Sequence, residues 1–394
     1  EGKELVVSSR EELSKIILKD NTLIPFGNRR SYGDCALHDQ MIKYANSKKE
    51  IELDKNTGIV KINSNVQIGK LIKCSLKYGW FLPVVPGSKF ITIGGAIASD
   101  VHGKNHYIDG CFSDHVISLE IMDLNGKILK CSNNDNSELF RATSGGMGLT
   151  GIILSAKIKL IKVKSQVIEK KTYKADSIEK IFSYFHKYQA NRFCVAWIDC
   201  SKNAKSIGRG IFSTGDYFDK IKKLNKTAKN IRIPFSLPPF FINKYTIKIF
   251  NYVYYNFHTI NKNKSSLVHF NQFFFPLDRV LNWNKLYGKL GFIQYQLVIP
   301  EKKSLDGIKE ILKVFLDANL YSPVTVLKRF GPENKNYLSF PMRGYTLSID
   351  LKRSPKVFII LDKVDILVKK MGGRIYLAKD ARIQSYLFEQ SYSD

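Results

Sequence analysis

Three segments near the start of the sequence are rich in glycine and in small polar or cationic residues. They are Pro25–Asp34 (PFGNRRSYGD), Pro86–Ala96 (PGSKFITIGGA) and Ser99–His106 (SDVHGKNH). Because glycine has no Cβ, backbone N–H groups in such loops can converge on an anion without obstruction. One loop of this kind is more often a plain turn, but the three together favour a diphosphate site, with Arg29, Arg30 or Ser31 as further donors.

A fourth glycine cluster, Gly146-x-Gly148-x-x-Gly151, has the spacing of a dinucleotide-binding fingerprint. That fingerprint requires a strand before the glycines and a helix after them. Here a predicted helix over 137–143 precedes the glycines and a predicted strand over 152–161 follows them, so we interpret the cluster as a tight turn. Walker A, H-E-x-x-H and G-x-S-x-G motifs do not occur, which removes the main support for P-loop kinases, zinc proteases and α/β-hydrolases.

Short strands and few helices must hold these loops. Apolar residues alternate in four predicted strands, at residues 59–62, 116–122, 127–131 and 152–161. Asn125-Gly126 between the second and third of them predicts a hairpin. Apolar residues at helical spacing predict a helix over 68–78 that ends at Gly79. This mixture predicts an α+β fold.

The composition changes after about residue 160, where glycine becomes scarcer and amphipathic helices are predicted over 177–188 and 304–316. We expect an N-terminal domain at 1–165, a second domain at 166–373 and a C-terminal segment at 374–394 that returns to the first domain. Residues 235–257 combine many Phe and Tyr residues with Lys244 and Lys248. Two interpretations stay open for this stretch, a buried aromatic helix and a surface that enters a membrane interface.

The chain of 394 residues carries 62 Lys and Arg against 35 Asp and Glu, a formal net charge of +27. Such a charge attracts nucleic acid, anionic lipid or a phosphorylated substrate, although a general enrichment in lysine would produce it as well. The six cysteines form no C-x-x-C pair, so we expect a reducing compartment and no metal site. The first residues lack the apolar core of a signal peptide, and no apolar run of about 18 residues could span a bilayer.

The motifs G-N-x-R-S-Y-G-D, P-G-x-x-x-x-T-x-G-G-A, D-x-H-G-K-N-H and Y-x-A-K-D-x-R, taken together, resemble the decaprenylphosphoryl-β-D-ribose 2-oxidase family. This family belongs to the flavoproteins related to vanillyl-alcohol oxidase. The resemblance runs from about residue 24 to the end of the chain. It implies an α+β, two-domain fold of the PCMH type, in which an inserted antiparallel-sheet domain covers the flavin ring of noncovalently bound FAD.

The resemblance also implies which residues contact FAD. The positions that match flavin-binding motifs are Gly27, Asn28, Arg29, Arg30, Ser31, Tyr32, Gly33, Pro86, Gly87, Ser88, Thr92, Gly94, Gly95, Ala96, Ser99, His102, Gly103, Asn105, His106, Gly151, Ile152 and Tyr376. Some relatives bond FAD covalently through a histidine at the position of His102. The H-G-K-N-H subgroup holds the flavin noncovalently, so we expect a contact role for His102.

The implied reaction is oxidation of the 2-hydroxyl of a ribofuranose that is linked through phosphate to a polyprenol. By family position, Lys379 lies at the reaction centre, where it could deprotonate or orient the hydroxyl, or stabilise developing negative charge. Tyr376 is expected to contact the flavin, and Gln294, Gln296 and Lys328 to line the substrate side, with Lys328 suited to a phosphate. Ser348 stands where mycobacterial members have a cysteine beside the flavin. Oxidation should survive this change, because hydride transfer requires no thiol.

The resemblance further implies a lipid-linked phospho-sugar substrate, an NAD(P)H-dependent keto-sugar reductase as partner, and peripheral association with the cytoplasmic face of the cell membrane. A soluble sugar, alditol or aldonolactone oxidase on the same fold is the alternative. A flavin-free relative is a further possibility. A nucleic-acid-binding protein is suggested only by the charge, and the sequence has no motif for one, so we expect no nucleic-acid partner.

Overall fold

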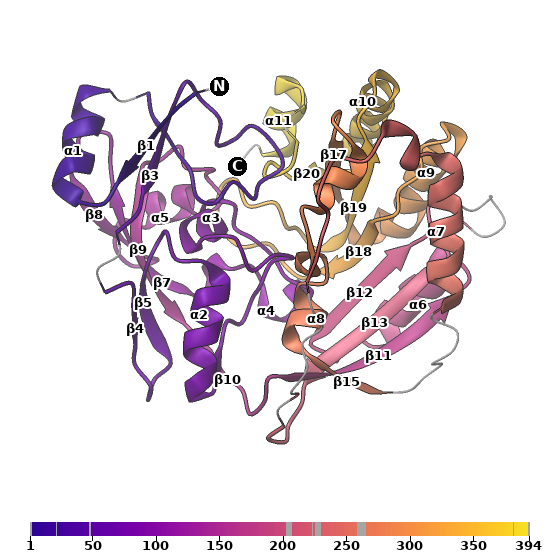
Figure 1. Ribbon diagram of the computed structural model, residues 1–394, viewed down its shortest axis with the longest axis horizontal. Coiled ribbons are helices and arrows are strands. Elements are labelled where there is room, and N and C mark those ends of the chain that lie inside the picture. Colours follow the sequence, from indigo (N-terminus) through magenta and orange to yellow (C-terminus); the bar gives the residue numbers. More distant parts are fainter. Residues whose placement is uncertain are drawn as a thin grey trace.

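The computed structural model describes residues 2–20, 22–46, 49–201, 207–222, 224, 230–257, 265–380 and 382–392. Its N-terminal elements lie on one side of the molecule and a large sheet built from later residues lies on the other (Figure 1). The α+β class expected from the sequence is confirmed by this mixture of helices and antiparallel sheets.

A five-stranded antiparallel sheet forms the centre of the N-terminal part, in the order β4-β5-β9-β7-β8. Its strands are β4 (Ile51–Leu53), β5 (Ile59–Asn63), β9 (Ile152–Lys159), β7 (Val116–Met122) and β8 (Ile128–Cys131). The predicted hairpin joins β7 to β8, and Gly126 adopts a φ of +70° at its turn. The tight turn predicted at Gly146–Gly151 leads directly into β9, with φ values of +87° at Gly148 and +130° at Gly151.

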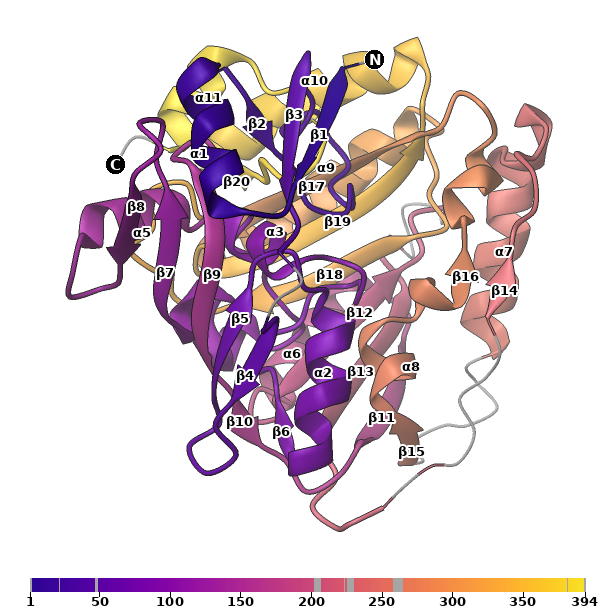
Figure 2. The ribbon, with the colours of Figure 1, turned by 60° about the vertical axis from the view of Figure 1, so that its left-hand side comes forward.

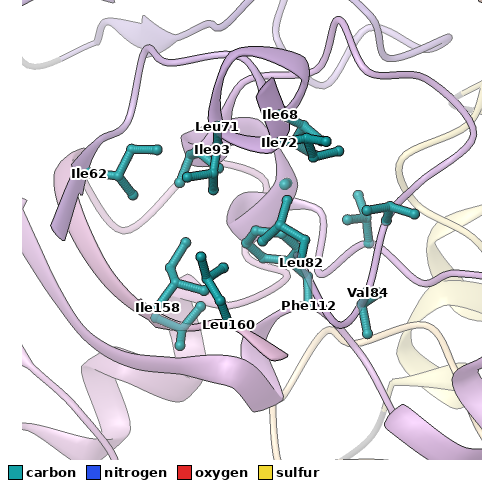
Figure 3. Close-up of a cluster of buried hydrophobic side chains, with 14 of the residues drawn as sticks. Ile62, Ile68, Leu71, Ile72, Leu82, Val84, Ile93, Phe112, Ile158 and Leu160 are labelled. Carbon is teal, nitrogen blue, oxygen red and sulfur yellow. The ribbon is translucent and has the colours of Figure 1, made fainter. Parts of the chain in front are cut away.

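Helix α2 (Ile68–Ser75) packs on this sheet through Ile68, Leu71 and Ile72, which recur at helical spacing and are fully buried. A 3-10 turn, η1 (Leu76–Tyr78), extends it to Gly79, whose φ of +74° ends the helix as predicted. Figure 3 shows these side chains packed with those of Ile93 and Ile158 and their neighbours. This core supports α3 (Ile93–Ala98), which lies under the glycine-rich loops.

Smaller elements flank this core. A three-stranded parallel sheet holds β1 (Lys3–Val7), β3 (Gln40–Tyr44) and β2 (Ile24–Pro25), with α1 (Arg10–Lys19) packed beside it. A two-stranded pair joins β6 (Trp80–Phe81) to β10 (Ile161–Lys162). The remaining short elements are α4 (His106–Asp109), α5 (Ser137–Thr143), β14 (Ile231–Arg232), α8 (Phe270–Phe274), β16 (Val280–Leu281), α11 (Ser385–Ser391), η2 (Ser113–His115), η4 (Pro239–Phe241), η5 (Leu277–Arg279), η6 (Trp283–Tyr287) and η7 (Glu301–Lys303).

An eight-stranded antiparallel sheet dominates the later part, in the order β15-β11-β13-β12-β18-β19-β17-β20. Its strands are β15 (Ser266–His269), β11 (Val167–Ala175), β13 (Gly210–Tyr217), β12 (Phe193–Ile198), β18 (Thr325–Phe330), β19 (Gly344–Lys352), β17 (Phe292–Pro300) and β20 (Arg374–Ile375). Helices α6 (Ile178–Lys187), α9 (Ser304–Asp317) and α10 (Pro355–Lys370) bury one face of it in a second core. The other face is turned toward the N-terminal part (Figures 1 and 2).

Polar contacts fasten the two parts together. The Arg192 guanidinium donates to both carboxylate oxygens of Asp109, at 2.8 and 2.6 Å. The buried Asp100 accepts hydrogen bonds from Asn334, Asn336 and Ser339. The division of the chain near residues 165 and 373 stays a prediction, and β20 joins the eight-stranded sheet through β17.

Helix α7 (Lys244–Phe257) decides between the two interpretations of the aromatic stretch. Among its residues only Ile247, Asn251 and Tyr255 are buried, while Tyr245 is 65% and Tyr252 60% exposed. The interpretation as a buried aromatic helix is therefore wrong. No helix in the described part of the chain is long and apolar enough to cross a membrane.

Candidate active site

Polar side chains gather on the face of the large sheet that is turned toward the N-terminal part. Residues alternate between the two faces of a strand. The odd-numbered apolar residues of β17 and β19 join the helix-covered core, so the even-numbered ones share the other face. The register pairs Gln294 with Asp350, Gln296 with Ser348, and Lys328 with Thr346. Three strands therefore bring all the predicted substrate-side residues into one polar patch.

The Lys379 ammonium group donates a hydrogen bond to Gln294 Oε1, and Gln294 Nε2 donates to Asp350 Oδ1 at 2.7 Å. Burial lowers the pKa of Lys379 to about 8, although the carboxylates of Asp350 and Asp380 oppose the shift. Burial likewise raises the pKa of Asp350 to about 7, against its hydrogen bond from Gln294 and the charge of Lys379. The second oxygen of Asp350 is buried without a partner among the described residues. A lysine and a carboxylate that both titrate near neutral pH are typical of a site that moves protons.

The C-terminal segment is held on β17 by backbone contacts. The Tyr376 N–H donates to the Gln296 carbonyl at 2.9 Å, and the Gln294 N–H donates to Asp380 Oδ2 at 2.7 Å. The Tyr376 hydroxyl donates to the Ser99 carbonyl at 2.7 Å, which ties the segment to the end of α3. These contacts place Lys379 between the sheet and the N-terminal loops.

His102 belongs to the third glycine-rich segment and faces the polar side of the large sheet. Gln296 Nε2 lies 3.0 Å from His102 Nε2, with the amide as donor, and the ring lies among Phe330, Phe340 and Tyr376. Burial lowers the pKa of His102 well below its ordinary value, and nearby lysines add to the shift, so the ring is neutral with its proton on Nδ1. That Nδ1 is buried without a partner among the described residues. A buried, unpaired donor fits an acceptor atom of a bound cofactor.

Two further lysines lie close to this centre. Burial lowers the pKa of Lys328 to about 7, and the charge of Lys379 adds to the shift. Burial lowers the pKa of Lys104 to about 7, and its ammonium group donates to the Phe273 and Phe274 carbonyls at the end of α8. Lys328 remains partly exposed on the sheet face, so it is available to an anion.

Aromatic rings border the centre on its other side. The Lys379 ammonium group lies 4.6 Å from the centroid of the Tyr32 ring. Tyr32 in turn packs edge-on against Phe292 at 5.7 Å and lies 6.5 Å from Trp283. The predicted flavin-binding Tyr32 is thus brought beside the predicted catalytic lysine, although the two are far apart in sequence.

The glycine-rich loops show where a side chain would not fit. A Cβ at Gly27 would lie 2.4 Å from Thr92 Oγ1, and a Cβ at Gly103 would lie 2.4 Å from Asn105 Oδ1. At Gly87 a Cβ would meet nothing within 4 Å, so this backbone faces open space. The loops therefore pack closely on one another and leave backbone accessible at Gly87, which fits the approach of a diphosphate.

The other predicted cofactor residues fall into two groups. In the first group the polar atoms are bonded within the protein, except the buried Asn105 Oδ1, which has no partner among the described residues. The N–H groups of Gly94, Gly95 and Ala96 bond to Ser64 and Thr92, Asn105 bonds to Pro83 and Asp109, and both ring nitrogens of His106 face Cys111 or Gly331. These residues shape the loops around the site.

The second group is mixed, because its arginine loop lies at the surface whereas Pro86, Gly151 and Ile152 are buried. Asn28, Arg29, Arg30, Ser31 and Gly33 lie in the loop between β2 and β3, where Arg29 pairs with Glu4 and Arg30 stacks on Phe90. Pro86 and Ser88 lie in the loop before α3. Gly151 and Ile152 line a cavity of about 320 Å³ together with Ile24 and Pro25, the strand that leads into the first glycine-rich loop.

Sequence reasoning missed Asp350, Thr346 and Lys104. Asp350 and Thr346 could have been found from the alternation Thr346-Leu347-Ser348-Ile349-Asp350, which puts three polar side chains on one strand face. Lys104 lies within a segment already singled out, but nothing in its spacing shows that it is buried. No group of His, Cys, Asp and Glu in the described ranges could hold a metal ion.

Comparisons with known proteins show which proteins this chain resembles. A family model described as an FAD binding domain matches residues 5–132. The decaprenylphosphoryl-β-D-ribose oxidase of Mycolicibacterium smegmatis is 33% identical over 385 residues, covering 94% of this chain and 83% of that protein. An uncharacterized protein in the mprA 5'region of Streptomyces coelicolor is 26% identical over 355 residues, covering 83% of this chain and 92% of that protein. Human Δ(24)-sterol reductase is 28% identical over 117 residues, which cover 30% of this chain and 23% of that protein.

The fold, the site and the matched domain define an FAD-dependent oxidoreductase with a PCMH-type cofactor domain. Within that class, the chain belongs to the decaprenylphosphoryl-β-D-ribose oxidase family, because the similarity extends over nearly its whole length. The match to the sterol reductase covers only about a third of the chain.

Proposed function

We propose that this enzyme oxidises the 2-hydroxyl of a polyprenyl-phosphoryl pentofuranose to the 2-keto sugar, the first half of an epimerisation used in surface-glycan synthesis. The observation that carries the proposal is the arrangement of Lys379, Gln294 and Asp350 on the polar sheet face, opposite His102 and Tyr376. The relative from M. smegmatis, named for the oxidation of decaprenylphosphoryl-ribose, supports the substrate class.

Each residue around the reaction centre has a separate role in the proposed oxidation. Bound FAD supplies the acceptor for the hydride that leaves the alcohol carbon. Lys379, whose pKa is lowered to about 8, accepts the hydroxyl proton in its neutral form. Gln294 holds the lysine nitrogen in place and is itself held by Asp350. Tyr32, Phe292 and Trp283 form an aromatic border on this side of the centre.

Lys328 is proposed to bind the substrate phosphate. It lies on β18, next to β19 on the polar face, and the charge of Lys379 is close enough to shift its pKa. Its pKa of about 7 would rise when a phosphodiester approaches, because an opposite charge favours the protonated form. A phosphate held there leaves the sugar between Lys328 and Lys379.

We also propose that the enzyme works at the cytoplasmic membrane face, with a keto-sugar reductase that uses NAD(P)H to complete the epimerisation. A lipid-linked substrate resides in the bilayer, and a 2-keto product must be reduced to give the epimer. The formal charge of +27 favours an anionic membrane surface.

Anaerobic mixing tests the substrate class directly. The holoenzyme is mixed with synthetic short-chain prenyl-phosphoryl ribose while the flavin absorbance is recorded, and prenyl-phosphoryl xylose, an alditol and an aldonolactone are run in parallel. We expect rapid bleaching with a phosphoryl pentose and none with the phosphate-free compounds. Bleaching by the alditol or the aldonolactone alone would replace the proposal by the soluble-substrate alternative.

A further inference from the structure

The outward face of α7 is apolar, which is unusual for a helix at a protein surface. Ile247, Asn251 and Tyr255 face the protein, since they are buried at a spacing of four residues. On the opposite side of the helix, Tyr245 and Ile249 are each 65% exposed and Val253 is 57% exposed. A surface helix normally carries polar residues on the side away from the core. This face has apolar residues where solvent-facing polar ones are expected.

The apolar surface continues into the segment before the helix. Phe240 in η4 is 70% exposed and Phe241 is 48% exposed, with their rings stacked at a centroid distance of 5.0 Å. Asn243 joins η4 to α7 by accepting hydrogen bonds from the N–H groups of Tyr245 and Thr246. We call the surface formed by residues 240–257 the α7 face.

The charged residues in the segment of the chain that carries the α7 face are all basic. No Asp or Glu occurs between Asp219 and Asp278, a stretch that includes Arg232, Lys244 and Lys248. Long lysine side chains flanking exposed aromatic rings suit a bilayer interface, where the rings enter the headgroup region and the ammonium groups reach the phosphates. Each Lys or Arg near an anionic leaflet adds to the attraction.

The same charges argue against a second copy of this chain as the occupant. In a two-fold symmetric dimer the α7 face would meet itself, so Lys244 and Lys248 would lie against identical cations. Nucleic acid could stack on rings such as Tyr245, but aliphatic Ile249 and Val253 on the same face offer it neither a ring nor a donor. An anionic lipid surface is the partner that satisfies both the apolar residues and the cations.

The α7 face lies at one end of the polar sheet face. Tyr254 of α7 packs against Trp197 of β12 at 4.7 Å, and Trp197 pairs across the sheet with Val326. Val326 pairs in turn with Ser348, beside the predicted reaction centre. Lys352, on the polar face of β19, donates to the Ile242 carbonyl just before α7. A continuous row of side chains thus joins the membrane-suited surface to the site.

We propose that the α7 face docks this enzyme on an anionic bilayer and delivers the lipid-linked substrate to the polar sheet face along Trp197 and Val326. The delivery step rests on the substrate of the proposed function, and the docking step rests on its membrane location. Docking is tested on the full-length holoenzyme by co-sedimentation with vesicles of phosphatidylglycerol and phosphatidylcholine, at low and moderate salt. The test variant is I249S/V253S, and the matched control is I359S/I366S on α10, whose side chains are 59% and 55% exposed.

The test variant should lose at least about tenfold in vesicle affinity, because two apolar side chains no longer enter the interface. The control and the wild type should bind alike, and binding of both should weaken as salt rises. All proteins should keep their flavin absorbance and melting temperature. The proposal would be overturned if the two double variants bound vesicles equally, or if the wild type did not bind them. It would also be overturned by a wild-type dimer that dissociates in the test variant, or by binding to single-stranded DNA instead of vesicles.

Kinetics separates the delivery step from the proposed function. I249S/V253S should oxidise a short-chain, water-soluble prenyl-phosphoryl ribose as fast as the wild type, and should be at least about fivefold slower on a long-chain substrate in vesicles. Equal rates on the vesicle substrate would overturn delivery through the α7 face. Absence of wild-type activity on the soluble analogue would instead overturn the proposed function, and the vesicle-binding result would still stand.

Discussion

The glycine-rich loops and the polar sheet face are both needed for the site, but they are built in opposite ways. In the loops, the N–H groups of Gly94, Gly95 and Ala96 are bonded locally, and the positions of Gly27 and Gly103 are fixed by close packing. On the sheet face, Lys379, Gln294 and Asp350 come from three distant segments and include a buried oxygen without a partner among the described residues. The loops are thus held by contacts within the protein, whereas the sheet face holds groups that can exchange protons near neutral pH.

The largest effect is expected from Lys379→Ala, which removes the proposed proton acceptor from the sheet face and leaves the loops unchanged. Flavin should remain bound, while substrate-dependent flavin reduction should fall by about 10³-fold, the usual contribution of a general base. Stopped-flow reduction under anaerobic conditions measures this. Near-normal reduction would refute the role of Lys379, and loss of the flavin would show that the two regions are not separable.

Neighbouring residues of β18 offer the next test, because they face opposite sides of the sheet. Lys328→Met should raise KM for a phosphorylated substrate by about tenfold to a hundredfold with little change in kcat, since a charged phosphate contact is lost. Leu327→Ala, in the helix-covered core, should lower the free energy of unfolding by about 2–5 kcal/mol and leave KM unchanged. Chemical denaturation and steady-state kinetics on both variants provide the comparison. The assignment of the faces fails if the two phenotypes are exchanged.

Gly87→Leu tests the loops themselves. A Cβ at Gly87 would meet nothing within 4 Å, so the fold should be intact and the apoprotein should melt at the wild-type temperature. If the backbone there approaches the diphosphate, FAD affinity should drop by at least about tenfold through a steric clash. Fluorescence titration of apoprotein with FAD measures the affinity. Unchanged affinity would place the diphosphate elsewhere.

The pH dependence of flavin reduction tests the sheet face in the unmodified enzyme. Neutral Lys379 is the active form and its pKa is lowered to about 8, so the rate should rise about tenfold between pH 7 and 9 and then level off. The Asp350 carboxylate raises the pKa of Lys379, so Asp350→Asn should move the midpoint to lower pH. A rate that falls over this range would mean that the cationic lysine is the active form.

The same contrast explains what the sequence could predict. The hairpin at Asn125-Gly126 and the helix that ends at Gly79 depend on local backbone preferences, and the structure places both as expected. The partnership of Lys379 with Asp350 depends on the register of β17 and β19, which no local pattern specifies. The exposure of α7 was undecidable for another reason, because a buried aromatic helix and an interfacial one have the same composition.

The smallest effect is expected from Ser348→Cys. Ser348 lies on the polar face of β19, paired with Gln296 and partly exposed, but it makes no contact with Lys379 that the reaction uses. A thiol there changes the surface of the pocket without adding or removing a proton acceptor, so flavin reduction should change by less than about twofold. The new thiol should react with iodoacetamide faster than the buried Cys111, Cys131 and Cys200 do, and bound substrate analogue should protect it. Mass spectrometry of the labelled peptides separates these sites. If the new thiol labels no faster than the buried ones, Ser348 does not face the substrate. A large loss of activity without labelling would show that this part of the sheet face takes part in the chemistry.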